Sequence, residues 1–173
     1  KLQGNETYVY IANHQDSLDL LLFGFIYPKN TISIGKKQIL YIPFFGIAFW
    51  LSGHLLINRE NQFKAISTLN KASQYLKSKK ASLIIMPEGT RTRENGLSSF
   101  KKGAFHLAIQ SQTPLKPIIV SPYYKKLNLN KINSGTIKIN ILEEICTKDL
   151  TENDLEDLII KTEELYKQSL TNM

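Results

Sequence analysis

The sequence predicts an α/β fold, in which one domain over residues 1–173 builds a mixed, largely parallel central sheet flanked by helices. Apolar runs rich in β-branched residues alternate along the chain with helical patterns, and this alternation is typical of sheets with parallel strands. The segment "ASLIIMPEG" at residues 81–89 is apolar almost throughout, as in a strand buried on both faces. A chain of 173 residues is long enough for one domain with a substantial core.

Six segments are predicted to be strands because they are rich in β-branched and aromatic residues. They lie at residues 7–13, 31–35, 54–58, 81–89, 116–120 and 136–142. Helical patterns occupy residues 16–27, 63–76, 103–110 and 151–166. Asp16 or Ser17 is placed to cap the first helix, and Thr151 with Asp154 resembles a capping box at the start of the last.

The segment at residues 38–58 has no charged residue, and its 21 residues could span a bilayer on hydropathy alone. Pro43 and two glycines interrupt it. Two other interpretations are a buried core helix followed by a strand, and a helix at a membrane interface with Tyr41 and Trp50 near the head groups. We favour the interface helix because of the interruptions. It would place an apolar surface beside basic residues, which suits molecules with a fatty tail and an anionic head.

The formal net charge of +7 is unevenly distributed. Residues 59–126 contain 13 Lys and Arg against three acids, whereas residues 143–166 contain nine acids. The basic middle indicates an anionic partner: phosphate head groups, a nucleic acid or a phosphorylated ligand. The basic residues lack the interleaved aromatics of single-strand nucleic-acid binders. A single cysteine, Cys146, excludes an internal disulfide and favours a reducing compartment.

The stretch "IANHQDSLDLLLF" at residues 11–23 places polar side chains between apolar runs, where an unpaired polar group costs free energy. His14 follows a predicted strand, at the sheet edge where open α/β sheets bind ligands. Asp19 falls at the start of the next helix, within reach of one ring nitrogen. A carboxylate there would fix the tautomer and leave the other nitrogen free as a base. Asp16 could take the same role, and the spacing alone does not separate the two.

A second group of candidate residues follows the strand at residues 81–89. Arg91 can bind a phosphate through two hydrogen bonds, and Arg59 ends another predicted strand. Glu88 could contribute to a ligand site, or it could accept backbone hydrogen bonds and shape the turn. There is no glycine-rich phosphate loop and no Cys/His cluster with zinc spacing.

Four segments together resemble the glycerolipid acyltransferases. "NHQDSLD" is similar to their N-H-x-x-x-x-D motif, "GHLLINR" to the second motif, "MPEGTR" to the third and "TPLKPIIVS" to the fourth. The motifs occur in family order over roughly residues 7–122, and the likeness outside them is closest to the bacterial 1-acyl-sn-glycerol-3-phosphate acyltransferases. Asp16, Leu56 and Met86 depart from common family residues, but none of them removes a group that the chemistry requires.

The resemblance implies a direct transfer of a fatty acyl group to the 2-hydroxyl of lysophosphatidic acid, which makes phosphatidic acid. His14 would be the general base, Asp19 would orient it, and Lys36 would stabilise the oxyanion. The substrate-binding residues would be Arg59, Glu88, Gly89, Thr90 and Arg91. The acyl donor would be acyl-CoA or an acyl carrier protein, with no cofactor and no metal. The resemblance also implies a phospholipid membrane as partner, at the cytoplasmic face of a bacterial inner membrane, and an anchor preceding Lys1.

Three alternatives compete with this function. A related acyltransferase would use another acceptor, such as glycerol 3-phosphate, another lysophospholipid or a lipid A precursor. A hydrolase would use Ser17 as the nucleophile activated by His14, although no G-x-S-x-G elbow is present. A non-catalytic basic module would bind nucleic acid or acidic membranes and would not depend on His14.

Overall fold

The computed structural model describes residues 6–26, 28–58, 62–128 and 130–173. The strands are β1 (Val9–Ala12), β2 (Thr31–Lys36), β3 (Leu55–Ile57), β4 (Ser82–Ile85), β5 (Leu115–Val120) and β6 (Ile139–Ile141). The α-helices are α1 (Asp19–Ile26), α2 (Phe45–Leu51), α3 (Gln62–Lys77), α4 (Gly103–Ser111) and α5 (Leu155–Thr171). Short 3₁₀ turns lie at Lys37–Tyr41, Arg93–Asn95 and Glu152–Asp154.

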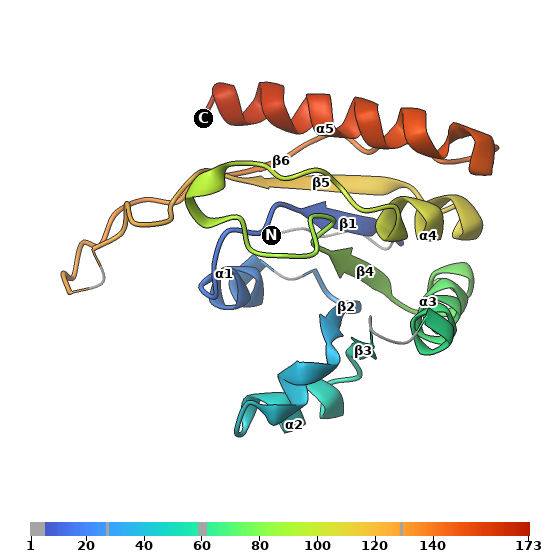
Figure 1. Ribbon diagram of the computed structural model, residues 1–173, viewed down its shortest axis with the longest axis horizontal. Coiled ribbons are helices and arrows are strands. Elements are labelled where there is room, and N and C mark those ends of the chain that lie inside the picture. The colour runs from blue at the N-terminus through green and yellow to red at the C-terminus, as the bar shows by residue number, and fades with distance from the viewer. Residues whose placement is uncertain (1–5, 27, 59–61, 129) are drawn as a thin grey trace.

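The six strands form one sheet in the order β3-β2-β4-β1-β5-β6. Neighbours from β3 to β5 are parallel, and β6 runs antiparallel to β5. This confirms the predicted mixed, largely parallel α/β fold. The carboxyl ends of the five parallel strands therefore lie along one edge of the sheet, and those of β1, β4 and β5 point to the left in Figure 1, toward α1 and the loop before β6.

Two apolar layers cover the sheet. On one face Leu76, Phe105 and Leu158, from α3, α4 and α5, pack in one core with strand residues such as Ile11 and Leu83. On the other face Phe23 of α1 packs with alternate strand residues, among them Tyr10 and Val120. This alternation follows from the period of two along a strand, and it explains why β1 is buried along its whole length.

The last helix is tied to the middle of the sheet by one side chain. The Tyr166 hydroxyl of α5 donates a 2.6 Å hydrogen bond to the carbonyl of Ile11 in β1 and a longer one to the carbonyl of Ile118 in β5. Tyr166 is fully buried, and burial raises the pKa of its hydroxyl, so the group stays protonated and remains a donor. The C-terminal helix thus joins the two strands that lead to the candidate site.

The first helix begins later than predicted. Residues 16–27 were expected to be helical with Asp16 or Ser17 as cap, but α1 starts at Asp19. The reason is that the backbone N–H groups of Gln15 and Asp16 turn back onto the Asp19 carboxylate, at 2.7 and 3.1 Å. The Leu18 N–H also donates to Oδ1 of Asp16 at 3.4 Å, and residues 16–18 form turns that lead into the helix.

The apolar segment at residues 38–58 is a 3₁₀ turn, a short helix and a strand. The interpretation as a buried core helix is wrong, because the side chains of Tyr41, Phe44, Ile47, Trp50 and Leu51 are 61–90% exposed. Gly46 lets α2 approach the 3₁₀ turn, since an added Cβ would lie 2.5 Å from a backbone carbonyl oxygen. Within the residues that the structure describes, none of the helices combines the length and apolar character needed to cross a bilayer.

Candidate active site

A buried carboxylate organises the carboxyl end of β1. Asp19 is 0% exposed, and its Oδ2 atom accepts hydrogen bonds from the backbone N–H groups of Gln15 and Asp16. The same oxygen lies 2.6 Å from Nδ1 of His14, and Oδ1 accepts a 2.6 Å bond from the Tyr123 hydroxyl. Burial of a charge is tolerated when such donors surround it. The structure therefore pairs His14 with Asp19, not with Asp16.

The imidazole of His14 is held at Nδ1 and is partly exposed to solvent. Its side chain is 18% exposed, and Nδ1 faces the buried carboxylate. Because Asp19 is an acceptor, Nδ1 carries the hydrogen in the neutral ring, and Nε2 is left with a lone pair. The arrangement can take a proton from a group that reaches the exposed side of the ring.

Glu88 braces His14 from the neighbouring strand end. One carboxylate oxygen accepts the backbone N–H of His14 at 2.7 Å, and the other accepts that of Ser98 at 3.2 Å. Glu88 is 2% exposed, and burial raises its pKa to about 6 even though both hydrogen bonds favour the charged form. Its contacts are those of a residue that bonds backbone amides and shapes the turn.

The turn after β4 is joined to the segment that carries His14. The Thr92 backbone N–H and hydroxyl both bond the carbonyl of His14, at 2.9 and 3.1 Å, and the Arg93 N–H bonds the carbonyl of Gln15. Gly89 has a φ of 70°, which favours glycine at this position. Thr90 and Arg91 project from this turn and are exposed. Arg91 is thus presented on a turn that is directly bonded to the histidine segment.

Lys36 lies farther along the same edge. Lys36 is exposed at the end of β2, and β4 separates that strand from β1. At about 4.8 Å between neighbouring strands, the backbones of β2 and β1 are roughly 10 Å apart. Arg59 lies outside the described residues. The structure therefore brings His14, Asp19 and Glu88 into contact, puts Gly89, Thr90 and Arg91 on the adjoining turn, and leaves Lys36 two strands away.

A cavity of about 400 Å³ lies near the ends of β2 and β3. It is lined by Lys37, Leu40, Leu56, Asn58, Ser67 and Thr68. Lys37 rather than Lys36 reaches it, and none of the lining residues belongs to the His14 cluster. Among the described residues, no group of three or more His, Cys, Asp or Glu side chains is arranged to hold a metal ion.

Sequence reasoning missed Asn13, Gln15, Thr92 and Tyr123. Asn13 and Gln15 are buried polar residues on either side of His14, so the argument about buried polar groups that singled out His14 applies equally to them. Tyr123 lies 104 positions from its partner Asp19, and no local pattern points to it.

These features define an α/β protein that presents a histidine–aspartate pair at the carboxyl edge of its sheet, braced by a glutamate from the next strand. The sequence model of the Acyltransferase family matches residues 1–121. The chain belongs to this family, and it is an acyltransferase.

The relatives are more specific. The chain is 34% identical over 165 residues to a 1-acyl-sn-glycerol-3-phosphate acyltransferase of Haemophilus influenzae, with 95% of this chain and 69% of that protein covered. It is 36% identical over 165 residues to the enzyme of the same name from Escherichia coli, with 95% and 67% covered. The fold is similar to the crystal structure of the 1-acyl-sn-glycerophosphate acyltransferase PlsC from Thermotoga maritima (TM-score 0.75, 22% identity, 99% and 68% covered).

Proposed function

We propose that this protein transfers a fatty acyl group from a thioester to the 2-hydroxyl of 1-acyl-sn-glycerol 3-phosphate, which yields phosphatidic acid. The observation that carries the proposal is the bond between Nδ1 of His14 and the buried Asp19 carboxylate, at an exposed sheet edge. The names of the relatives support this acceptor.

His14 is the general base in this mechanism. Nε2 takes the proton of the acceptor hydroxyl while the oxygen attacks the thioester carbonyl, and a tetrahedral oxyanion forms. When the intermediate collapses, the carbon–sulfur bond breaks and the imidazolium returns the proton to the leaving thiolate. Such a base contributes about 10²–10⁴-fold in rate. Asp19 stabilises the imidazolium and holds the tautomer.

Cationic side chains bind the anionic parts of the reaction. Arg91 projects from the turn bonded to the His14 segment, where its planar guanidinium can grip the acceptor phosphate through two hydrogen bonds. Arg59 is proposed as the second phosphate ligand, and Lys36 as the group that stabilises the oxyanion. Glu88, Gly89 and Thr90 shape the turn that carries Arg91. The donor is the thioester of coenzyme A or of an acyl carrier protein, and the proton transfers are the same for both.

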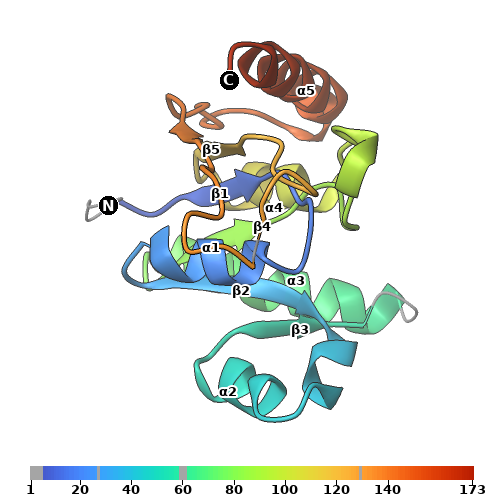
Figure 2. The same cartoon turned by 90° about the vertical axis from the view of Figure 1, so that its left-hand side faces the viewer.

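The acceptor reaches the site from a membrane in this proposal. Figure 2 looks from the side of the molecule that carries α1 and shows α1 in front with α2 below it. Both helices expose apolar side chains, including Leu21 and Phe25 of α1 and Trp50 of α2. Exposed aromatics beside basic residues are typical of segments that lie at a bilayer surface. We infer that this side of the protein contacts the cytoplasmic face of a bacterial inner membrane.

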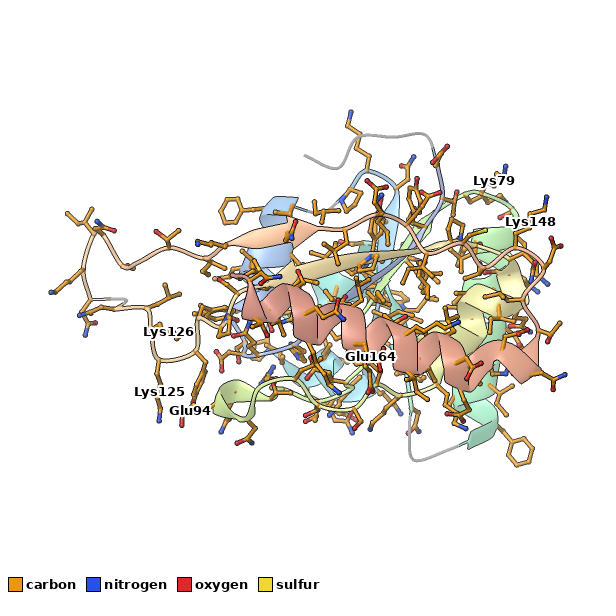
Figure 3. The ribbon with its side chains drawn as sticks, turned by 90° about the horizontal axis from the view of Figure 1, so that it is seen from above. Lys79, Glu94, Lys125, Lys126, Lys148 and Glu164 are labelled. Carbon is orange, nitrogen blue, oxygen red and sulfur yellow. The ribbon has the colours of Figure 1, made fainter. Side chains whose placement is uncertain are left out.

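Two lysines lie at the end of the molecule toward which the carboxyl end of β5 points. Figure 3 shows Lys125 and Lys126 near Glu94 at one end, whereas Lys79 and Lys148 lie at the opposite end. Lys125 pairs with Glu94 at 2.6 Å, while Lys126 is exposed. Lysines near a bilayer surface attract anionic lipids. Lys79 is therefore a suitable control for tests of membrane contact at Lys126.

An acceptor-competition assay tests the proposed function. The purified protein is given a donor with a labelled acyl group, either acyl-CoA or acylated acyl carrier protein. The acceptors offered are lysophosphatidic acid, glycerol 3-phosphate and lysophosphatidylcholine. We expect labelled phosphatidic acid as the main product, and its loss in His14→Ala. His106→Ala is the matched control, since His106 of α4 is exposed and pairs with Glu152, which begins the 3₁₀ turn before α5.

Two results would contradict the proposal. If another acceptor is labelled preferentially, the proposed acceptor is wrong, while the assignment as an acyltransferase stands. Full activity in His14→Ala, or loss of activity in Ser17→Ala comparable with that in His14→Ala, would overturn the mechanism, because the first would make the base unnecessary and the second would indicate a serine nucleophile.

A further inference from the structure

The carboxylate that holds His14 is itself held by a tyrosine 104 positions farther along the chain. Tyr123 follows β5 and is 2% exposed, and its hydroxyl donates a 2.6 Å hydrogen bond to Oδ1 of Asp19. Oδ2 of the same carboxylate is the partner of His14 Nδ1, also at 2.6 Å. A single buried carboxylate therefore links the phenol and the imidazole.

The residues on either side of His14 fix the position of this tyrosine. Asn13 exchanges two hydrogen bonds with Val120, at 2.9 and 2.8 Å. The Gln15 side-chain amide donates to the carbonyls of Val120 and Ser121, and its oxygen accepts the backbone N–H of Tyr123 at 3.0 Å. Because both neighbours of His14 bind the end of β5, the histidine and the tyrosine are placed by the same contacts.

We propose that Tyr123 is a positioning residue that sets the basicity of His14 through Asp19. A strong donor on Oδ1 draws negative charge away from Oδ2, and this weakens the attraction of the carboxylate for a protonated imidazole. Without that donor the carboxylate would hold the imidazolium more tightly, and His14 would release its proton less readily. The inference rests on the proposed function for its effect on catalysis, but the hydrogen-bond chain exists independently of it.

The tyrosine is a permanent donor in this arrangement. Burial raises the pKa of its hydroxyl, and the hydrogen bond and charge of Asp19 raise it further, so the phenol keeps its proton throughout the range in which imidazole titrates. Among the described residues, two further ionisable groups act on this hydrogen-bond chain: the charge of Asp16 acts on Tyr123, and Glu88 accepts the His14 backbone N–H. Replacement of Tyr123 by phenylalanine keeps both of these groups and the aromatic packing.

A titration of the His14 ring by NMR tests this inference. The ring signals are assigned with His14→Ala, and the wild type is compared with Tyr123→Phe and with the control Tyr124→Phe, which alters the adjacent phenol. We expect Tyr123→Phe to raise the pKa of His14 by about half a unit to one unit and Tyr124→Phe to leave it unchanged. The acid limb of the kcat profile should move to higher pH by the same amount, with KM for the acceptor unaltered.

A second replacement keeps the inference testable if Tyr123→Phe fails to fold. Incorporation of 3-fluorotyrosine at position 123 preserves the shape and makes the phenol a stronger donor, so the pKa of His14 should fall. Unchanged His14 titration in the folded variants, or shifts of the same sign in both, would overturn the inference. If the wild type transfers no acyl group but its His14 titration responds as expected, the proposed function fails while the coupling stands.

Discussion

The two halves of the carboxyl edge of the sheet are built in opposite ways. Where β1, β4 and β5 end, polar side chains are buried and bonded, and Asp19 and Glu88 together accept six donors from the segments around His14. Beyond β2, by contrast, residues 37–51 contain two short helical segments in which most large apolar side chains face solvent, although Phe49 is buried. The first half fixes the geometry of one imidazole, whereas the second offers apolar area for a partner. Mutations in the first half should therefore lower turnover, whereas mutations in the second half should weaken membrane binding.

The largest expected effect on turnover comes from Asp19→Asn, which disrupts the hydrogen bonds at the ends of β1, β4 and β5. The amide has one acceptor oxygen in place of two, so it cannot satisfy the backbone donors, Tyr123 and Nδ1 of His14 together. We expect turnover to fall by about 10³–10⁴-fold, because the imidazole is held in the wrong tautomer. Steady-state kinetics check this, with Asp16→Asn as the neighbouring control. Comparable losses in both variants would contradict the assignment of Asp19.

Mutations of the exposed apolar side chains in residues 37–51 should weaken membrane binding while leaving the fold intact. Phe44 and Trp50 are 90% and 61% exposed, so replacement of both by serine removes little packing within the protein. Transfer of each aromatic side chain to an apolar environment is worth about 1.5–3 kcal/mol, and vesicle binding should weaken by at least a hundredfold. Liposome flotation measures this, and Ile160→Ser on α5 is the control for an exposed apolar residue elsewhere. Equal binding by the two variants would reject the proposed contact.

Glu88 makes the free energy of unfolding of the protein depend on pH. Its pKa rises from the ordinary 4.5 to about 6 on folding, so between these values the folded protein keeps a proton that the unfolded chain releases. The contribution of Glu88 to the free energy of unfolding is thus highest below pH 4.5, and it falls by about 2 kcal/mol as the pH rises through 6. In urea denaturation, the free energy of unfolding of the wild type minus that of Glu88→Gln should fall by about 2 kcal/mol as the pH rises through this window. A value that rises with pH would refute the assignment.

The smallest expected effect is that of Lys126→Gln. This lysine lies at the same end of the molecule as Lys125, and its loss removes one charge from the proposed membrane side. The binding free energy to vesicles with anionic lipids should weaken by about 1 kcal/mol, with no change for neutral vesicles. Lys79→Gln, at the opposite end, should bind as the wild type does. Identical losses in both would mean that the contact depends only on net charge.

The sequence predicted the parts of this molecule that depend on local patterns. The six strands and the order of strand and helix follow from periodicity, and the spacing of five residues was enough to place Asp19 near His14. The spacing could not separate Asp19 from Asp16, because that choice depends on where the helix begins. The contact with Tyr123 was out of reach, because it depends on the pairing of β1 with β5 across about a hundred residues.

The bond from Tyr166 to Ile11 has a consequence for how the protein matures during synthesis. His14, Asp19, Glu88 and Tyr123 are all translated before the residue that ties β1 and β5 together from behind. A nascent chain that stops short of residue 166 holds these four groups but leaves the carbonyl of Ile11 without the tyrosine hydroxyl. Those two strands therefore gain this link only after residue 166 has left the ribosome.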